Sequence, residues 1–226
     1  MPNPATPEAN FAEARAIARA IAQSLPSEVA ARTMTLKSKL PFKAMSIRET
    51  LIHRVSALAT PAIALFEAEH ELAGSILTRA VLESVAVAFA LDRESESFLT
   101  LKDEERFDGF LMSCLVGSRW PGEEVQARNI LTLIDHVDKT FEGYRATYDA
   151  LCEYAHPNWS GVMGAFGTLD RKNYVLKLGR SERSTVGHAG VTALAMALSL
   201  FHHQYNELAV TIVRLNEHFV QSPSRA

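Results

Sequence analysis

Residues 72–91, LAGSILTRAVLESVAVAFAL, form the most apolar stretch of the chain, and they decide its fold. The stretch is long enough to span a membrane, which takes about 20 largely uncharged residues. However, Arg79 and Glu83 interrupt it, and charged side chains are seldom buried without a partner. We therefore interpret the stretch as the core helix of a bundle, running over roughly residues 70–92.

Helical spacing of apolar residues continues on both sides of this helix. Thr6 followed by Pro7 is a typical helix start, and Pro157 ends a helix because the residue before a proline is pushed out of the helical region. Pro61 is expected to kink the helix that contains it. The expected helices cover about residues 7–25, 46–69, 70–92, 107–115, 123–139 and 141–155, and a long last helix begins after a cap at Ser184 and Thr185.

Residues 161–179, GVMGAFGTLDRKNYVLKLG, break the helical period and contain two short strand-like runs on either side of residues 170–173. This pattern is typical of a β-hairpin. The sequence therefore predicts an all-α fold, a helical bundle of about six or seven helices with one small β-hairpin before the last long helix. The bundle domain is expected over residues 46–219, after an N-terminal helix and connector at 1–45 and before a flexible C-terminal tail at 220–226.

Composition restricts the class of protein. The chain has 226 residues, of which 47% are hydrophobic and 22% charged, so it can bury one sizeable core. Its 23 basic and 26 acidic residues leave a formal net charge of −3, which gives no overall field that would draw it to nucleic acid or an anionic membrane. Cys114 and Cys152 are too few for a disulfide framework, and no secretory signal begins the sequence. We expect a cytoplasmic protein that makes no membrane contact.

The polar residues of the core helix form the first candidate site. Ser75, Arg79 and Glu83 are four residues apart, so they lie on one stripe of the helix and must face something polar. One interpretation is an ion pair within the helix, although pairs of this spacing are better with the acidic residue first. The other is a wet cleft, since coupled charges also mark functional sites. Both interpretations stay open from the sequence alone.

A second candidate lies in residues 148–159, YDALCEYAHPNW. A rotation of about 100° per residue places Asp149, Cys152, Glu153 and His156 within about a third of the helix circumference. His156 either complements the dipole at the C-terminal end of its helix or transfers protons, with a neighbouring glutamate fixing its tautomer.

We expect the two candidates to form one cleft. A helix that buries Arg79 and Glu83 must satisfy both charges, because an ion left buried and alone costs several kcal/mol. The segment 148–159 is the densest source of complementary groups, and we expect it to supply Tyr148, Glu153 and His156. The predicted catalytic residues are therefore His156, Glu153, Arg79 and Glu83. The predicted ligand-binding residues are the aromatic side chains Tyr148, Tyr154 and Trp159, whose spacing also suits the core.

The combination of an Arg-x3-Glu pair on an apolar helix with a Tyr-x2-Leu-x-Glu-x2-His-Pro segment, a small hairpin and a long last helix resembles bacterial helical proteins near the HEPN group. The similarity covers roughly residues 46–219. It implies a helical bundle, commonly dimeric, that acts as a ribonuclease or as a binding module. The matching residues are Arg79, Glu83, Tyr148, Leu151, Glu153, His156 and Pro157.

HEPN ribonucleases carry Arg-x4 to 6-His at the active site. Two segments match that spacing, Arg48 to His53 and Arg183 to His188. With the arginine and histidine content of this chain, roughly two matches arise by chance, so neither indicates a nuclease site. The chain therefore departs from the nuclease pattern where it matters most, and this departure counts against ribonuclease activity.

Metal ligation is a separate possibility. Glu-x2-His occurs at residues 67–70 and 153–156, and this spacing places both ligands on one helix face, as in di-metal carboxylate bundles. Both copies lie at helix ends rather than at mid-bundle, so we predict no metal site and no cofactor.

Three classes of function follow from these patterns. The first is a HEPN-like module associated with a nucleotide or RNA, with a polar cleft built on Arg79, Glu83, Glu153 and His156. The main alternative is a non-catalytic helical interaction or scaffold protein, and a di-metal enzyme comes third. Whether the protein is an enzyme stays open, because a fold does not imply a function. We expect a homodimer formed through an apolar face of a long helix.

Overall fold

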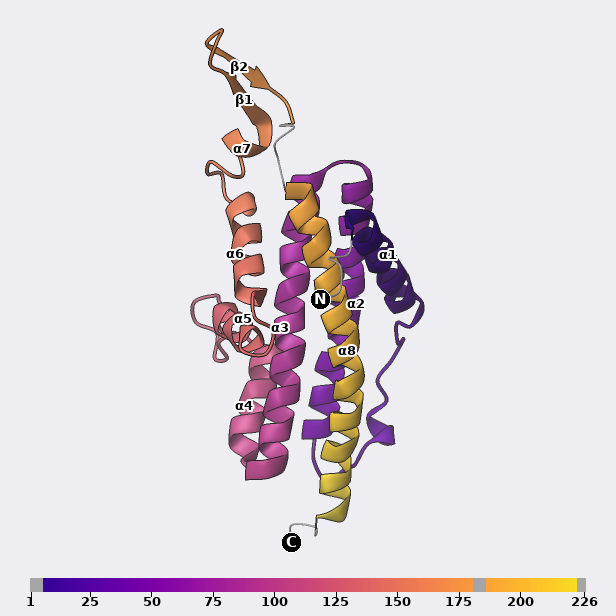
Figure 1. Cartoon of the computed structure of the whole chain (residues 1–226). Helices are drawn as coiled ribbons and strands as arrows, with labels where there is room; N and C mark the ends of the chain where they lie inside the picture. Colours follow the sequence, from indigo (N-terminus) through magenta and orange to yellow (C-terminus); the bar gives the residue numbers. More distant parts are fainter. Residues whose placement is uncertain (1–5, 181–185, 223–226) are drawn as a thin grey trace.

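Three long helices lie side by side and form the body of the molecule (Figure 1). They are α2 (Leu40–Glu67), α3 (Glu71–Leu101) and α8 (Val186–Gln221), in a computed structural model that describes residues 6–180 and 186–222. The central helix is α3, because it packs against both α2 and α8. The predicted all-α bundle is confirmed.

Four shorter helices flank this body. They are α1 (Pro7–Gln23), α4 (Glu104–Leu115), α5 (Ile130–Asp138) and α6 (Tyr144–Ala155), and a single 3₁₀ turn spans Ala31–Thr33. The first of them, α1, packs against α8 and α2, whereas α4, α5 and α6 pack against α3 on its other side (Figure 1). The central helix is therefore covered from several directions.

A β-hairpin projects beyond one end of the bundle (Figure 1). It follows the one-turn helix α7 (Met163–Phe166) and consists of β1 (Gly167–Asp170) and β2 (Val175–Leu178). The strands pair antiparallel, with Leu169 opposite Leu176. The hairpin expected before the last long helix is confirmed, and the short α7 is an addition that the sequence did not predict.

Two helices extend further than predicted. α2 starts at Leu40 rather than at residue 46, because Leu40 and Pro41 are already buried and a proline in the first turn has no N–H that a helix would use. α3 continues to Leu101 through polar sequence. Ser95 and Phe98 lie in that polar part and are 0% and 3% exposed, so burial against neighbouring helices outweighs the missing apolar period.

The predicted helix at 123–139 is shorter than expected. α5 begins only at Ile130, after Asn129 caps it by accepting the backbone N–H of Leu131 at 3.0 Å. Residues 116–129 instead form a loop, and a parallel β-bridge between Ser118 and Gln126 closes it. This loop becomes one wall of the candidate site below.

Two predicted features fall outside the described residues. These are the cap of the last helix at Ser184 and Thr185 and the end of the C-terminal tail after residue 222. Within the described part, α8 continues to Gln221, so the first residues of the expected tail are helical.

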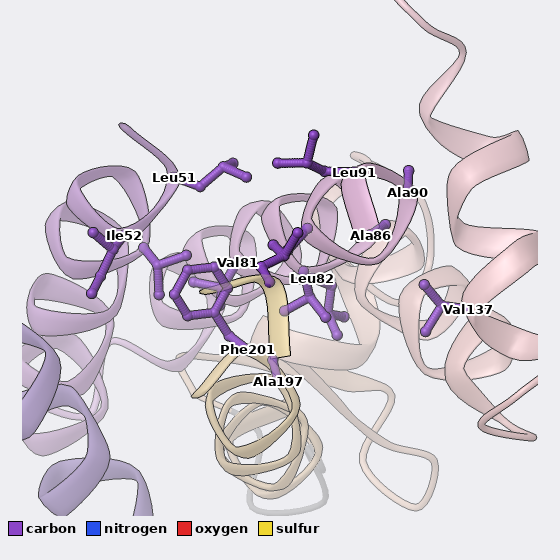
Figure 2. Packing of buried hydrophobic residues seen from close by; sticks show 14 of the residues in the cluster. Leu51, Ile52, Val81, Leu82, Ala86, Ala90, Leu91, Val137, Ala197 and Phe201 are labelled. Carbon is purple, nitrogen blue, oxygen red and sulfur yellow. The ribbon is translucent and has the colours of Figure 1, made fainter. Parts of the chain in front are cut away.

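Side chains from α2, α3 and α8 meet in one core. Figure 2 shows Ile52 of α2, Val81 and Leu82 of α3, and Phe201 of α8 among the buried side chains of this core. All four are at most 2% exposed. Alanines such as Ala197 keep the helices close, so a large buried surface replaces any need for a disulfide or a metal in the core.

A close approach of α3 and α8 depends on glycine. A Cβ placed on Gly190 of α8 would lie 2.4 Å from Ser75 Oγ and 2.7 Å from Cζ of Phe66. A Cβ on Gly74 would lie 2.8 Å from Cε1 of the same ring. The Phe66 ring thus fills the space that two glycines leave, and α3 and α8 pack more tightly there than alanine would allow.

By length and composition alone, α3 is also apolar enough to cross a membrane. Half of its most apolar 18-residue window is buried inside the bundle. Core helices of bundles can be equally long and apolar. In this structure α3 is such a core helix, because α2, α4, α5, α6 and α8 pack on it.

Candidate anion-binding cavity

A cavity of about 680 Å³ lies where α2, α3 and α4 meet the 116–129 loop and the start of α5. Its size falls in the range of about 300 to 1,000 Å³ that is usual for small-molecule sites. Apolar side chains form part of its lining, namely Ile47, Leu51, Val87, Ile130 and Leu133. A ligand with both an apolar and a polar part therefore fits it.

The charged lining of the cavity is strongly one-sided. Four arginines line it, Arg54 from α2, Arg79 from α3, and Arg119 and Arg128 from the loop, against one carboxylate, Glu83. Four positive charges and one negative charge give a formal +3 in a chain whose formal net charge is −3. Concave sites with one sign of charge concentrate ligands of the opposite sign.

Arg79 and Glu83 share a hydrogen-bond network with Tyr148 of α6. Nε and Nη2 of Arg79 donate to Tyr148 Oη at 3.2 and 3.1 Å, and Tyr148 Oη donates to Glu83 Oε1 at 2.9 Å. Arg79 Nη2 also lies 3.4 Å from Glu83 Oε1. Arg79 and Glu83 therefore form the ion pair expected within the helix, and both also line the cavity.

Protonation in this network is set by burial and by charge. Burial raises the pKa of Tyr148 to about 12, the Arg79 guanidinium opposes that rise, and Glu83 adds to it. Burial lowers the pKa of Arg79, but the hydrogen bonds with Tyr148 and the nearby Glu83 outweigh burial and leave it raised. At neutral pH, Tyr148 is a neutral donor and Arg79 a cation.

Two further arginines are held by serines. Arg54 Nε donates to Ser84 Oγ at 3.2 Å, and Arg128 Nε donates to Ser113 Oγ at 2.9 Å. Each serine hydroxyl donates its own hydrogen to a helix carbonyl, so it presents lone pairs to the guanidinium. The Arg128 guanidinium also lies 5.4 Å from the centroid of the Phe110 ring. These contacts position the Nε edges of the two arginines.

These arginines are not neutralised within the described chain. In residues 6–180 and 186–222, none of Arg54, Arg119 and Arg128 forms an ion pair with a carboxylate. Other arginines do have such partners, for example Arg145, which pairs with two aspartates. The charge in the cavity is therefore available to an anionic ligand.

Cys114 is the thiol that lines the cavity. Burial raises its pKa to about 11, and Arg128 and Ser113 only partly oppose that rise. The thiol is neutral at physiological pH, and a neutral thiol is a poor nucleophile. Cys114 thus contributes apolar wall rather than a reactive group.

Glu153 and His156 do not line this cavity, contrary to the expected single cleft. Both are exposed on the surface, where Glu153 Oε2 accepts a hydrogen bond from Asn158 Nδ2 at 2.6 Å. Asn158 Oδ1 in turn accepts the backbone N–H of Gly161 at 3.2 Å, and a Cβ at Gly161 would lie 2.2 Å from the carbonyl oxygen of His156. These residues close a tight turn after α6, and Pro157 directs the chain away from α3.

The three aromatic residues predicted to bind a ligand also lie in different places. Tyr148 is 1% exposed and belongs to the network beside the cavity, whereas Tyr154 is half-buried against the core. Trp159 is 74% exposed, and it lies beyond the turn on the way to the hairpin. The structure thus brings together Arg79, Glu83 and Tyr148 from the predicted set.

The Arg48 to His53 pair does not form a nuclease site. Arg48 is in a buried ion pair with Glu49, its Nε donates to the carbonyl of Tyr205 at 3.0 Å, and Tyr205 Oη donates to Glu49 at 2.6 Å. The Nε2 atom of His53 lies 2.7 Å from the carbonyl oxygen of Pro26 instead. Of the second match, Arg183 lies outside the described residues.

The Glu-x2-His pairs do not gather into a metal centre. Glu67 forms an ion pair with Arg15 at 2.5 Å, and His70 is the residue before α3. Among the described residues, no group of three or more His, Cys, Asp or Glu side chains is placed to hold a metal ion.

Sequence reasoning missed Arg54, Arg119 and Arg128. Each is a single charged residue at an exposed position, so nothing in its local pattern distinguishes it from an ordinary surface arginine. Only the packing of the 116–129 loop against α2, α3 and α4 brings them together. The one local signal was the polar stripe of α3, of which Arg79 and Glu83 line the cavity, whereas Ser75 is buried and donates to the carbonyl of Val186 at 3.3 Å.

No family model, no curated protein and no solved structure matches the chain. The HEPN-like resemblance therefore stays a prediction, carried by the motif residues of α3 and α6.

Proposed function

We propose that the protein is a binding module that holds a phosphorylated small molecule, such as a nucleotide, in the cavity between α2, α3, α4 and the 116–129 loop. The observation that carries the proposal is the set of three arginines, Arg54, Arg119 and Arg128, that line the cavity without a carboxylate partner in the described chain. Guanidinium groups bind phosphate with paired hydrogen bonds, which makes arginine the usual residue for that recognition.

The shape and the walls of the cavity support a small ligand. A volume of about 680 Å³ accommodates a nucleotide-sized molecule, and the apolar lining offers a surface for its uncharged part. Thr50, Ser84 and Ser113 also line the cavity, but each hydroxyl donates its hydrogen to a helix carbonyl, so it can only accept a hydrogen bond from the uncharged part of a ligand. The HEPN-like resemblance points in the same direction, since it implies a nucleotide- or RNA-associated module.

The tyrosine beside the cavity and the thiol that lines it favour binding over catalysis. Proton transfer at neutral pH needs a group whose pKa lies near the working pH, and the pKa of Tyr148 and that of Cys114 are both raised well above it. The histidine predicted to transfer protons, His156, is on the surface at the end of α6. The exposed hairpin favours a second candidate function, an interaction protein.

Thermal unfolding in the presence of different ligands tests this proposal. AMP and ATP are expected to raise the melting temperature, whereas adenosine, which lacks the phosphate, is not. At a ligand concentration of about 100 times Kd, the stabilisation is about 2.7 kcal/mol, or roughly 5 to 10 °C for a chain of this size. Stabilisation by a short RNA but not by AMP would assign the arginines to RNA, and no shift with any phosphorylated compound would contradict the proposal.

A further inference from the structure

The exposed apolar surface of the protein is concentrated in one segment. We call residues 159–180 the arm, because it contains α7 and the hairpin that projects from the bundle (Figure 1). Nineteen large apolar side chains are exposed in the described part of the chain, and nine of them lie between Trp159 and Leu178. An exposed patch of this extent usually marks an interaction site.

The hairpin has an apolar face that the bundle does not cover. Side chains alternate along a strand, so the register places Leu169, Leu176 and Leu178 on one face and Thr168 and Lys177 on the other. The three leucines are 58%, 41% and 81% exposed. The strands pack on each other, and β1 packs on α7. An isolated two-stranded hairpin is marginally stable in water, so this face is suited to a partner.

The area of the arm matches one side of a stable interface. Taking about 150 to 250 Å² for a large side chain, the exposed fractions of the nine apolar residues sum to roughly 1,000 Å². A standard protein interface buries about 800 Å² on each partner. The whole arm therefore exposes about as much apolar surface as one side of a standard interface, and the three leucines of the hairpin face supply about a third of it.

Charge identifies the kind of partner. Arg180 is already ion-paired with Glu69 and Glu71 of its own copy. Residues 167–179 contain three basic side chains and one acidic side chain, a formal +2, which leaves −5 for the rest of a chain whose total is −3. The arm is thus complementary to the body of a second copy, whereas two arms repel each other. The segment 135–153 alone has five acidic and two basic residues, a formal −3. It leads directly into the arm, so a two-fold axis at their junction brings each arm to α6 of the other copy.

The hairpin tip argues against a lipid surface. Arg171 and Lys172 occupy the turn directly after Asp170, which ends β1, and the three leucines lie on the flat of the strands, whereas the exposed Tyr174 lies in the turn. Insertion of the tip into a bilayer would bury three charges. The flat apolar face suits a protein surface instead.

We propose that the protein forms a homodimer in which the arm of each copy packs its leucine face against the α5 and α6 surface of the other. This interface differs from the one expected from the sequence, which used an apolar face of a long helix. The large apolar residues of α3 and α8 lie mostly in the core, whereas nine of the nineteen exposed large apolar side chains of the described residues belong to the arm. The proposal does not depend on the cavity.

Sedimentation equilibrium of the full chain tests the dimer. The wild-type protein is expected to show twice the 24.9 kDa mass of one chain at micromolar concentration. Leu169→Glu with Leu178→Glu is expected to raise the dimer dissociation constant at least about 100-fold, because two apolar contacts are lost and two charges are added. Thr168→Glu is the matched control on the opposite face, and it should leave the mass unchanged.

Far-ultraviolet circular dichroism of the same variants shows whether the bundle has folded. A wild-type mass of 24.9 kDa at tens of micromolar concentration overturns the proposal. So does a dimer that persists in the Leu169→Glu, Leu178→Glu variant. Vesicles of anionic phospholipid test the alternative partner. Binding of the monomeric protein to these vesicles through the arm would overturn the proposal, because lipid rather than a second copy would then cover the leucine face.

Discussion

Replacement of Tyr148 by phenylalanine tests the network that joins α3 to α6. The change removes one hydroxyl that accepts from Arg79 and donates to Glu83, and it leaves the buried ring in place. Hydrogen bonds to charged groups contribute about 1.5 to 3 kcal/mol each. The side chains of Arg79 and Glu83 are 32% and 26% exposed, so water replaces part of what is lost.

We therefore expect Tyr148→Phe to lower the free energy of unfolding by about 1.5 to 3 kcal/mol at neutral pH. Urea unfolding followed by circular dichroism measures this difference, provided that the slope of the transition is unchanged. Tyr174→Phe is the matched control, because Tyr174 is 92% exposed and its change is expected within about 0.5 kcal/mol of wild type.

The pH dependence gives the same variant a second readout. The pKa of Tyr148 is raised from 10.0 to about 12, so the folded state holds the proton more tightly than the unfolded state does. This contribution is complete below pH 10 and is lost as the pH rises through about 12, which corresponds to roughly 2 to 3 kcal/mol. The difference between wild type and Tyr148→Phe should shrink over that interval. Equal stabilities at neutral pH, or a difference that grows above pH 10, would refute the reasoning.

Three further predictions concern packing, a buried ion pair and a thiol. Gly190→Ala should destabilise the protein by about 1 to 3 kcal/mol in urea unfolding, because the added Cβ overpacks the contact between α3 and α8. Gly109→Ala in α4 is the control: a Cβ there meets nothing within 4 Å, so this change should stabilise the protein by about 0.5 to 1 kcal/mol. Glu49→Ala should cost about 3 to 5 kcal/mol in the same assay, because it leaves the buried Arg48 without its carboxylate, and a loss under 1 kcal/mol would contradict that burial. Alkylation of Cys114 by iodoacetamide should be slow at pH 8 and accelerate toward pH 11, and fast reaction at pH 8 would show a lower pKa.

The sequence was sufficient for most of the fold. The apolar period of α3 and α8, the proline after α6 and the strand-like runs around Asp170 each depend on local chemistry, and each led to the right element. The predicted ends of the helices were wrong where burial against neighbouring helices outweighs the local sequence pattern. Ser95 is polar, yet it lies at 0% exposure inside α3, so the polar run after residue 92 did not end the helix.

The site was only partly predictable, because it is assembled from segments far apart in the chain. The need of Arg79 and Glu83 for a polar partner correctly indicated Tyr148, since the cost of burying an unpaired charge holds in any fold. No comparable energetic cost determines which way the chain turns after Pro157, so the sequence did not show that His156 lies on the surface. Arg54 and Arg128 come from α2 and from a loop that the sequence assigned to a helix, so their convergence could not be seen.

Calorimetric titration of AMP into the wild-type protein and into matched arginine variants tests the central claim, that the arginine-lined cavity binds a phosphorylated ligand. Arg54→Gln and Arg128→Gln should each weaken binding by about 10- to 100-fold, the loss expected for hydrogen bonds to a charged group. Arg19→Gln changes the net charge equally on the exposed face of α1 and should leave the affinity unchanged. No binding of AMP by the wild type, or the same loss in all three variants, would contradict the account.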